Sequence, residues 1–258
     1  MKIVTFLTDF GTVDGYVAAM KGVVVEACPS VQLVDTSHDV PPQNIRAGAW
    51  TLRYYWNLFP KGTIHVAVVD PGVGSRRKPL LVNADGRWLI GPDNGLFSWV
   101  FETAQRWRAY RIRPTVLRPD AVGQTFQGRD IFAYAAGLLA AGASRKDLAD
   151  SVVKPIRFDW PKPNIRRRRI LGEIIHVDRF GNVISNIPVE RVDNNSQTLL
   201  ISCNQLQIKK LSQFYTSAPG GSTLALCGSS GLLELSVNQG NVAELYGISL
   251  GDAVEVRW

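Results

Sequence analysis

The residues best suited to chemistry are Asp70 and Arg77, which stand on either side of a turn rich in Gly and Pro. The apolar run Val66–Val69 precedes Asp70 and is typical of a strand buried on both faces of a parallel sheet. Open α/β sheets bind their ligands at the carboxyl ends of such strands. A carboxylate held there by a guanidinium is a candidate catalytic pair, and an ion pair that only pins the turn is the structural alternative.

Asp9 follows another apolar run, Ile3–Leu7, and precedes the helical spacing of Tyr16–Ala27. Its carboxylate could accept hydrogen bonds from two neighbouring hydroxyl groups of a sugar. The alternative is that Asp9 caps the helix that follows. The sequence leaves both interpretations open.

The C-terminal part contains further polar candidates. Asp178 and Asn182 bracket a turn, which such residues form by default. The Gly-Ser-Ser-Gly sequence at 228–231 matches either an anion-binding nest or a plain hairpin turn. Glu234 lies in the apolar run Leu232–Val237, where a carboxylate needs a protein cation or a ligand ammonium group as its partner.

Several familiar catalytic and metal-binding patterns are missing from the sequence. The three histidines, His38, His65 and His176, are isolated and lack the spacing of metal ligands. There is no Gly-x-Ser-x-Gly elbow, no Walker loop and no Gly-x-Gly-x-x-Gly sequence after the first apolar run. The chemistry of this protein therefore depends on carboxylates at strand ends.

The elements that must position these residues fall into two groups. Strands alternate with helices in the first part, which predicts a three-layer α/β domain with a mostly parallel sheet over 1–154. A segment with three prolines and four consecutive arginines, 155–169, is interpreted as a linker. Short strands with Gly and Asn turns predict a smaller β-barrel domain over 170–258. The expected strands are 3–7, 31–34, 66–69, 80–84, 88–90, 170–177, 183–187, 199–203, 223–226, 232–237 and 253–256, and the expected helices are 16–27, 45–59 and 129–141.

Composition narrows the class of protein. The chain has 258 residues, of which 45% are hydrophobic, and a net charge of +7. The charge admits a nucleic-acid partner, but the excess is local and lacks interleaved aromatic and Gly residues, which disfavours that partner. Three distant cysteines indicate a reducing compartment. The first nine residues carry no signal peptide or membrane span, and we expect a cytoplasmic protein with no membrane partner.

Taken together, blocks spread over nearly the whole chain resemble the S-adenosyl-L-methionine hydrolases that form adenosine. This family is also called the SAM hydroxide adenosyltransferases and is related to the fluorinases and chlorinases. Each block is a modest signal alone, and their order is highly specific. The matching blocks are Leu7–Gly11, Val34–His38, Phe59–Gly74, Gly91–Gly95, Gly128–Ala133, Asp178–Asn182 and Gly228–Gly231.

The resemblance implies a nucleoside-binding α/β domain, a C-terminal β-barrel domain, and a homotrimer with active sites between subunits. It implies hydrolysis of S-adenosyl-L-methionine to adenosine and L-methionine, with no metal or cofactor. Asp70, Arg77 and Gln127 would be catalytic and handle the water. The substrate would be bound by Asp9 at the ribose hydroxyls and by Asp14, Phe126, Asp178, Phe180, Asn182, Ser229, Glu234 and Val237.

One position departs from the family pattern. The usual His-Gly-Arg-Asp block reads Gln-Gly-Arg-Asp here, because Gln127 replaces the histidine. Gln127 cannot take up a proton near neutral pH, so we expect it to position the water with a modest rate penalty. Two alternatives are a protein that binds S-adenosyl-L-methionine or adenosine without turnover, which Gln127 favours, and a 5′-halogenase, which Asp70 disfavours because its charge would repel a halide.

Overall fold

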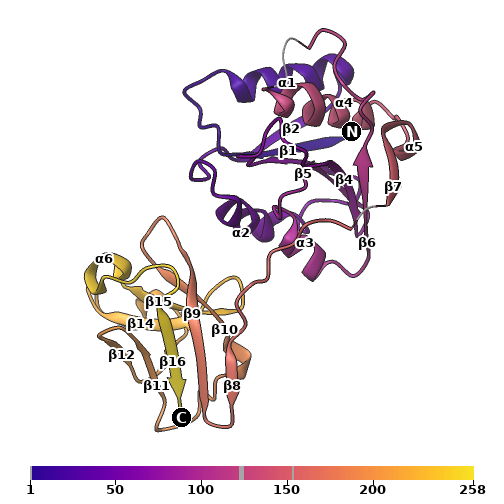
Figure 1. The fold of residues 1–258 in the computed structure, drawn as a ribbon. Helices are drawn as coiled ribbons and strands as arrows, with labels where there is room; N and C mark the ends of the chain where they lie inside the picture. The colour runs from indigo at the N-terminus through magenta and orange to yellow at the C-terminus, as the bar shows by residue number, and fades with distance from the viewer. Residues whose placement is uncertain (1, 122–124, 153) are drawn as a thin grey trace. The chain divides into compact units, whose positions relative to one another are not determined.

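The computed structural model describes residues 2–121, 125–152 and 154–258, and the chain divides into two compact units, Met1–Phe158 and Asp159–Trp258. Figure 1 shows a helix-covered sheet in the first unit and a curled sheet of short strands in the second. Because each unit has its own buried apolar cluster, each is described by itself.

The sheet of the first unit has the strand order β2-β1-β3-β5-β4-β6-β7. Strands β2, β1, β3, β5 and β6 run in one direction, and β4 and β7 run in the other. The predicted mostly parallel sheet is therefore confirmed. The strands are β1 (Ile3–Thr8), β2 (Gln32–Ser37), β3 (Ile64–Val68), β4 (Pro79–Ala84), β5 (Arg87–Pro92), β6 (Trp107–Ile112) and β7 (Ala149–Val152).

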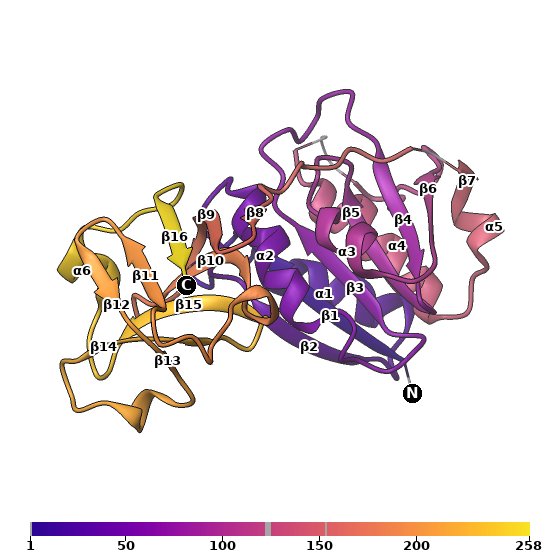
Figure 2. The same ribbon diagram turned by 90° about the horizontal axis from the view of Figure 1, so that it is seen from below.

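Helices cover both faces of this sheet, which completes the predicted three layers (Figures 1 and 2). One layer contains α1 (Tyr16–Ala27) and α4 (Tyr134–Ala140), which pack against each other. The other contains α2 (Ile45–Tyr55) and α3 (Ser98–Thr103). A short helix, α5 (Arg145–Leu148), precedes β7.

Two predicted helices differ from the observed ones. The helix expected over 45–59 ends at Tyr55, and Leu58 then donates its backbone N–H to the Tyr55 carbonyl in a tight turn before Pro60. The helix expected over 129–141 begins one residue earlier, as a π-helix, η1 (Gly128–Ala133), and becomes regular only in α4. Such π-turns occur often at functional sites, and η1 directly follows Gln127.

The hairpin predicted at Asp85 and Gly86 is confirmed. Both residues have positive φ, 46° and 82°, as a two-residue turn between twisted antiparallel strands requires. Sequence analysis missed β6, because it interpreted its arginines only as part of a basic group. In the structure Ala109 and Ile112 of β6 face the core and Arg108 and Arg111 are exposed.

The second unit is a nearly closed β-barrel with the strand order β12-β11-β16-β9-β10-β15-β14-β13, in which β12 also contacts β14. The predicted barrel is confirmed. Asn164–Arg166, inside the segment interpreted as a linker, forms β8 and pairs with β9. The other elements are β9 (Arg169–Val177), β10 (Val183–Pro188), β11 (Leu200–Cys203), β12 (Leu206–Ile208), β13 (Leu211–Ser212), β14 (Thr223–Cys227), β15 (Leu232–Val237), α6 (Val242–Tyr246) and β16 (Ala253–Arg257).

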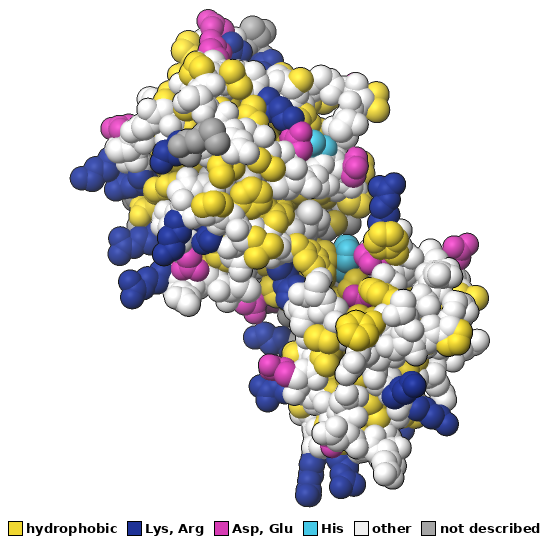
Figure 3. All heavy atoms as spheres, turned by 180° about the vertical axis from the view of Figure 1, so that it is seen from behind, with side chains coloured by type: hydrophobic (Ala, Val, Ile, Leu, Met, Phe, Trp, Pro, Cys, Tyr) yellow, Lys and Arg dark blue, Asp and Glu magenta, His cyan; other side chains and the backbone are white. Residues whose placement is uncertain are grey.

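The charge distribution on the surface and the length of the helices bear on whether the protein binds nucleic acid or a membrane. On the face shown in Figure 3, Lys and Arg side chains are scattered over both units and do not form one continuous stripe. None of the helices in the described part of the chain combines the length and the apolar character needed to cross a bilayer.

Candidate functional site

Asp70, Arg77 and Gln127 form one hydrogen-bonded group in the α/β unit. The Arg77 Nε donates to both Asp70 carboxylate oxygens, at 2.9 and 2.8 Å, and its Nη2 donates to Asp70 Oδ2. The same Nη2 donates to Gln127 Oε1 at 2.6 Å. The side chains of Arg77 and Asp70 are only 8% and 5% exposed. The structure thus brings together the three residues that were predicted to be catalytic.

Three elements place this group. Asp70 follows the fully buried strand β3, Arg77 precedes β4, and Gln127 lies at the start of η1. The loop between β3 and β4 turns tightly, since Ser75 donates its N–H to the Gly72 carbonyl and Gly74 has a φ of +79° that favours Gly. The Arg77 guanidinium also lies over the Phe132 ring at 5.2 Å, which fixes it from the helix side.

Asp9 is positioned by a loop and not by a helix. Its Oδ2 accepts a hydrogen bond from the backbone N–H of Gln43 at 2.7 Å. The residue before α1 is Gly15, and no side chain caps that helix, so the N-cap interpretation of Asp9 is wrong. The helix begins too far along the chain for Asp9 to reach its first N–H groups.

The other two substrate-binding candidates of this unit differ in their surroundings. Asp14 is exposed on the loop before α1. Phe126 is half-buried and packs edge-on against Phe10 and Tyr16, with ring centroids 6.1 and 5.2 Å away. Phe126 therefore belongs to an aromatic cluster directly beside Gln127.

In the barrel, Asp178 organises the turn between β9 and β10. Its Oδ1 accepts the N–H groups of Phe180 and Asn182, at 2.8 and 2.9 Å, and its Oδ2 accepts the Asn182 side-chain amide at 2.9 Å. The structure therefore confirms the turn-forming interpretation of these residues. Asn182 is buried, whereas the Phe180 ring is 76% exposed and available for stacking.

A cavity of about 620 Å³ opens beside this turn, and several predicted residues line it. Asp178, Phe180, Asn182 and Val237 are among its walls, together with Tyr215. This volume lies within the range of small-molecule sites. An exposed aromatic ring, an amide and a carboxylate around one cavity suit a planar polar ligand.

Glu234 is buried in β15 and has neutral partners. The Tyr215 hydroxyl donates to Glu234 Oε1, and so does Ser236 Oγ at 3.1 Å. Burial and the bond to Glu234 raise the pKa of Tyr215, so its hydroxyl stays protonated. In the part of the chain that the structure describes, Glu234 forms no ion pair. Of the two partners considered from the sequence, the protein cation is thus not observed.

The Gly-Ser-Ser-Gly segment, 228–231, is a hairpin turn between β14 and β15. Gly228 donates its N–H to the Leu232 carbonyl, and Gly231 donates to the Gly228 carbonyl. Ser229 is exposed at the tip and is not among the walls of the 620 Å³ cavity. The hairpin interpretation of this segment is confirmed.

Sequence reasoning missed two features of these sites. His38, in the loop next to Asp9, is hydrogen-bonded at both ring nitrogens. Its Nδ1 lies 2.8 Å from Thr8 Oγ1, and its Nε2 lies 2.9 Å from Asp35 Oδ1. His38 belongs to the block Val34–His38 that carries part of the family resemblance, but nothing in that block indicates its contacts with Thr8 and Asp35. Tyr215, the partner of Glu234, lies in a short 3₁₀ helix, η3 (Tyr215–Ser217), which leaves no periodic signal in the sequence.

The two units define a class of two-domain protein, in which an α/β unit holds a buried Asp–Arg–Gln group and a barrel holds a cavity with a buried carboxylate nearby. Family models of the SAM hydroxide adenosyltransferase N-terminal and C-terminal domains match residues 4–149 and 172–255. The chain belongs to the SAM hydroxide adenosyltransferase family.

Individual relatives agree with this membership. The chain is 36% identical to an (R)-S-adenosyl-L-methionine hydrolase of Thermus thermophilus, over 99% of this chain and 100% of that protein. It is 28% identical to a fluorinase of an Actinoplanes species, over 98% of this chain and 97% of that protein. A solved structure, of an uncharacterized conserved protein from Thermotoga maritima, matches with a TM-score of 0.90 and 29% identity, over 99% of this chain and 100% of that one.

Proposed function

We propose that this protein hydrolyses S-adenosyl-L-methionine to adenosine and L-methionine, by in-line attack of a water molecule on the ribose C5′. The observation that carries the proposal is the buried Asp70–Arg77–Gln127 group at the carboxyl end of β3. Family membership and the hydrolase relatives support the same reaction.

The chemistry asks little of the protein beyond placing the water. The leaving group is a neutral thioether, so it needs no general acid. The enzyme has to align one water with the C5′–S bond and accept its proton. A free Asp carboxyl has a pKa of about 3.9 and is a weak base. Asp70 therefore acts mainly through its fixed position and its charge.

Arg77 and Gln127 hold that geometry. Arg77 fixes both carboxylate oxygens of Asp70, and the hydrogen bond from Arg77 to Gln127 keeps the amide beside them. Gln127 takes the position of the family histidine as a hydrogen-bonding group that orients water without titrating. This assignment predicts turnover, although slower than with a proton acceptor.

Residues of both units would bind the substrate. Asp9 is assigned to the ribose hydroxyls, and Phe180 with Asn182 to the flat adenine ring. Glu234, which is buried without a cation among the described residues, is assigned to the ammonium group of the methionine part. The remaining members of the proposed binding set are Asp14, Phe126, Asp178, Ser229 and Val237.

The proposed function also involves an oligomeric assembly and a cellular location of the protein. Because the binding residues come from two units of the chain, we infer that a homotrimer combines residues from different subunits in one site. Mass measurement in solution tests the trimer. Mixing Asp70→Asn with Asn182→Ala tests the shared sites at substrate concentrations below KM, since mixed assemblies would contain some sites with both residues intact and would exceed the activity of either variant alone. We also infer a cytoplasmic location, which cell fractionation tests.

The decisive experiment incubates pure protein with S-adenosyl-L-methionine in ¹⁸O-labelled water. We expect adenosine that carries one ¹⁸O at C5′, together with unlabelled methionine. Tight binding without adenosine release over hours would instead favour the binding protein, the second candidate that Gln127 supports. A parallel incubation with chloride or fluoride tests the halogenase, and 5′-halo-5′-deoxyadenosine as the main product would overturn the proposal.

The halogenase is disfavoured by the charge at Asp70. A halide at contact distance from a carboxylate would be repelled by about 4 kcal/mol at an effective dielectric constant near 20. A water molecule meets no such repulsion and can donate a hydrogen bond to the same oxygen.

A further inference from the structure

A second, smaller cavity lies in the α/β unit and is lined in part by Arg77 and Gln127. Its volume is about 250 Å³, and neither Asp70 nor Asp9 is among its described walls. Arg77, Gln127, Arg111, Arg113 and Asp130 all line it. We name it the rear chamber, because it shares Arg77 and Gln127 with the proposed catalytic group.

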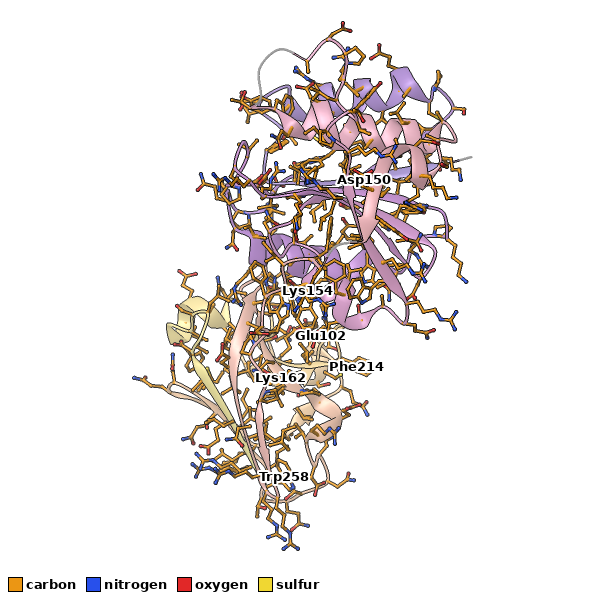
Figure 4. The ribbon with its side chains drawn as sticks, turned by 45° about the vertical axis from the view of Figure 1, so that its right-hand side comes forward. Glu102, Asp150, Lys154, Lys162, Phe214 and Trp258 are labelled. Carbon is orange, nitrogen blue, oxygen red and sulfur yellow. The ribbon has the colours of Figure 1, made fainter. Side chains whose placement is uncertain are left out.

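The charges of the side chains that line the rear chamber do not cancel one another. Arg77 is paired with Asp70, Arg113 with Asp150 at 2.6 Å, and Asp130 with Arg129 at 2.7 Å. Figure 4 labels Asp150 at β7. The Arg111 side chain on β6 forms no ion pair or hydrogen bond within the part of the chain that the structure describes. One guanidinium is therefore left without a countercharge, which matches a ligand with a single negative charge.

Arg77 has one nitrogen left over for a ligand. Arg77 uses Nε and Nη2 for Asp70 and Gln127, and in the described part of the chain its third nitrogen, Nη1, donates to no protein atom. The Arg77 side chain is only 8% exposed and is itself a chamber wall. Because Nη1 has no protein acceptor among the described residues, a ligand carboxylate within reach of it would gain a charge-assisted hydrogen bond.

Apart from Ser75, the rest of the chamber is apolar. Its remaining walls include Ile112, Leu117 and Ile131, as well as two prolines, Pro79 and Pro114. A hydrated inorganic ion would leave these walls without contacts. An anion with a short apolar tail would satisfy the cations with its head and the side chains with its tail.

The geometry points to the rear chamber as a binding site for a small aliphatic monocarboxylate, which contacts Arg111 and Arg77 and thereby lowers turnover. The carboxylate oxygens bind the two guanidiniums, and the tail lies among Ile112, Leu117 and Ile131. Because the same guanidinium holds Asp70 and Gln127, a second carboxylate bound to it at Nη1 weakens its attraction for Asp70 and loosens the catalytic group. The effect on turnover rests on the proposed function, whereas binding does not.

Calorimetric titration of the full-length protein with hexanoate tests binding directly. We expect saturable binding to the wild type and at least a tenfold loss of affinity in Arg111→Gln, because a charge-assisted hydrogen bond is removed. Arg108→Gln is the matched control: it removes the same charge from the same strand, β6, but Arg108 is not a chamber wall. It should bind hexanoate like the wild type. No saturable binding to the wild type, or equal affinity in Arg111→Gln, would overturn the site.

Two further measurements sharpen the result. Hexanol has the same tail without the charge, and affinity equal to that of hexanoate would overturn the monoanion assignment. In steady-state hydrolysis, hexanoate should lower kcat several-fold with KM unchanged, and this inhibition should be lost in Arg111→Gln. An unchanged kcat at saturating hexanoate would refute the coupling. If the protein has no hydrolase activity, calorimetry still shows whether hexanoate binds in the rear chamber. A failure of the binding site can therefore be told apart from a failure of the proposed function.

Discussion

The two units treat their buried carboxylates in opposite ways. In the α/β unit, Asp70 is held by Arg77, and both side chains are nearly inaccessible. In the barrel, Glu234 is 7% exposed yet meets only the neutral hydroxyls of Tyr215 and Ser236 among the described residues. The first carboxylate has its countercharge within its own unit, and the second does not.

This difference indicates a division of labour. A buried ion pair is rigid and costly to break, so it suits a group that must keep a water in one place. A buried carboxylate without a cation is unfavourable until a positive ligand arrives. S-adenosyl-L-methionine carries an ammonium and a sulfonium, and it would supply that charge. The α/β unit would then determine the rate, and the barrel would contribute mainly to affinity.

Replacing Asp70 with Asn should have the largest effect on the reaction. The variant keeps the shape of the side chain and loses the charge beside the water. We expect kcat to fall by about 10²- to 10³-fold, as when one preorganised electrostatic group is removed from an active site. Steady-state assays of adenosine release measure this effect.

Stability must be followed in the same variant, because Asp70→Asn leaves Arg77 buried and uncompensated. Loss of one partner of a buried pair costs about 3 kcal/mol, so assays belong well below the unfolding midpoint. Glu26→Gln, which removes an exposed partner of Arg118, is the control and should match the wild type. A folded Asp70→Asn protein with normal kcat would remove the assigned role of the α/β unit.

Replacing Glu234 with Gln should raise KM and leave kcat nearly unchanged. The lost charge-assisted hydrogen bond to the substrate ammonium corresponds to about a 10- to 100-fold increase in KM. The matched control is Glu190→Gln, an exposed barrel carboxylate paired with Arg191. A variant that lost kcat at constant KM would contradict the division of labour between the two units.

Acid should weaken the folded protein through its buried histidines. Burial lowers the pKa of His65 in β3 to about 4, although its bond to the Trp56 carbonyl opposes this shift. Because the pKa is about 6.5 in the unfolded chain, the unfolded state takes up the proton first as the pH falls. The stabilisation is complete above pH 6.5 and is lost between about pH 6.5 and pH 4.

The expected loss is about 1–3 kcal/mol in the free energy of unfolding. His176 in the barrel also has a pKa lowered to about 4 by burial, so both units should be acid-sensitive. Chemical denaturation at pH 7 and pH 4.5 measures the loss. His65→Gln should flatten the dependence, and an identical pH slope in that variant would exclude His65 as its source.

The sequence was sufficient for most of the fold because the buried strands carry strong signals. The ranges predicted for α1 and β15 coincide with the observed elements, and β3 is buried at every position. The sequence did not predict the structure correctly where the same residue types are compatible with two kinds of local structure. The two arginines of β6, Arg108 and Arg111, resembled part of a charged surface segment, and η1 resembled an ordinary helix because π-turns have no composition of their own.

For the site, spacing alone predicted the Asp70–Arg77 contact, since seven residues around a tight turn leave few other arrangements. Gln127 lies fifty residues further along the chain and was found only through the family resemblance. Tyr215 was missed, because its role depends on how the short 3₁₀ helix that contains it packs against β15. Long-range contacts of polar side chains leave no periodic trace in a sequence.

Replacing Gln127 with His should have the smallest effect and separates positioning from proton transfer. Arg77 already anchors the Gln127 amide oxygen at 2.6 Å, and the Arg77–Asp70 pair does not depend on residue 127. If the role is to position water, histidine should raise kcat by less than about tenfold, well below the full contribution of a general base. Rates between pH 6 and pH 8 measure it, since an active histidine base would also add a pKa to the profile. A gain of several orders of magnitude would show that the α/β unit lacks a base, and the rate would then depend on proton transfer more than on the fixed carboxylate.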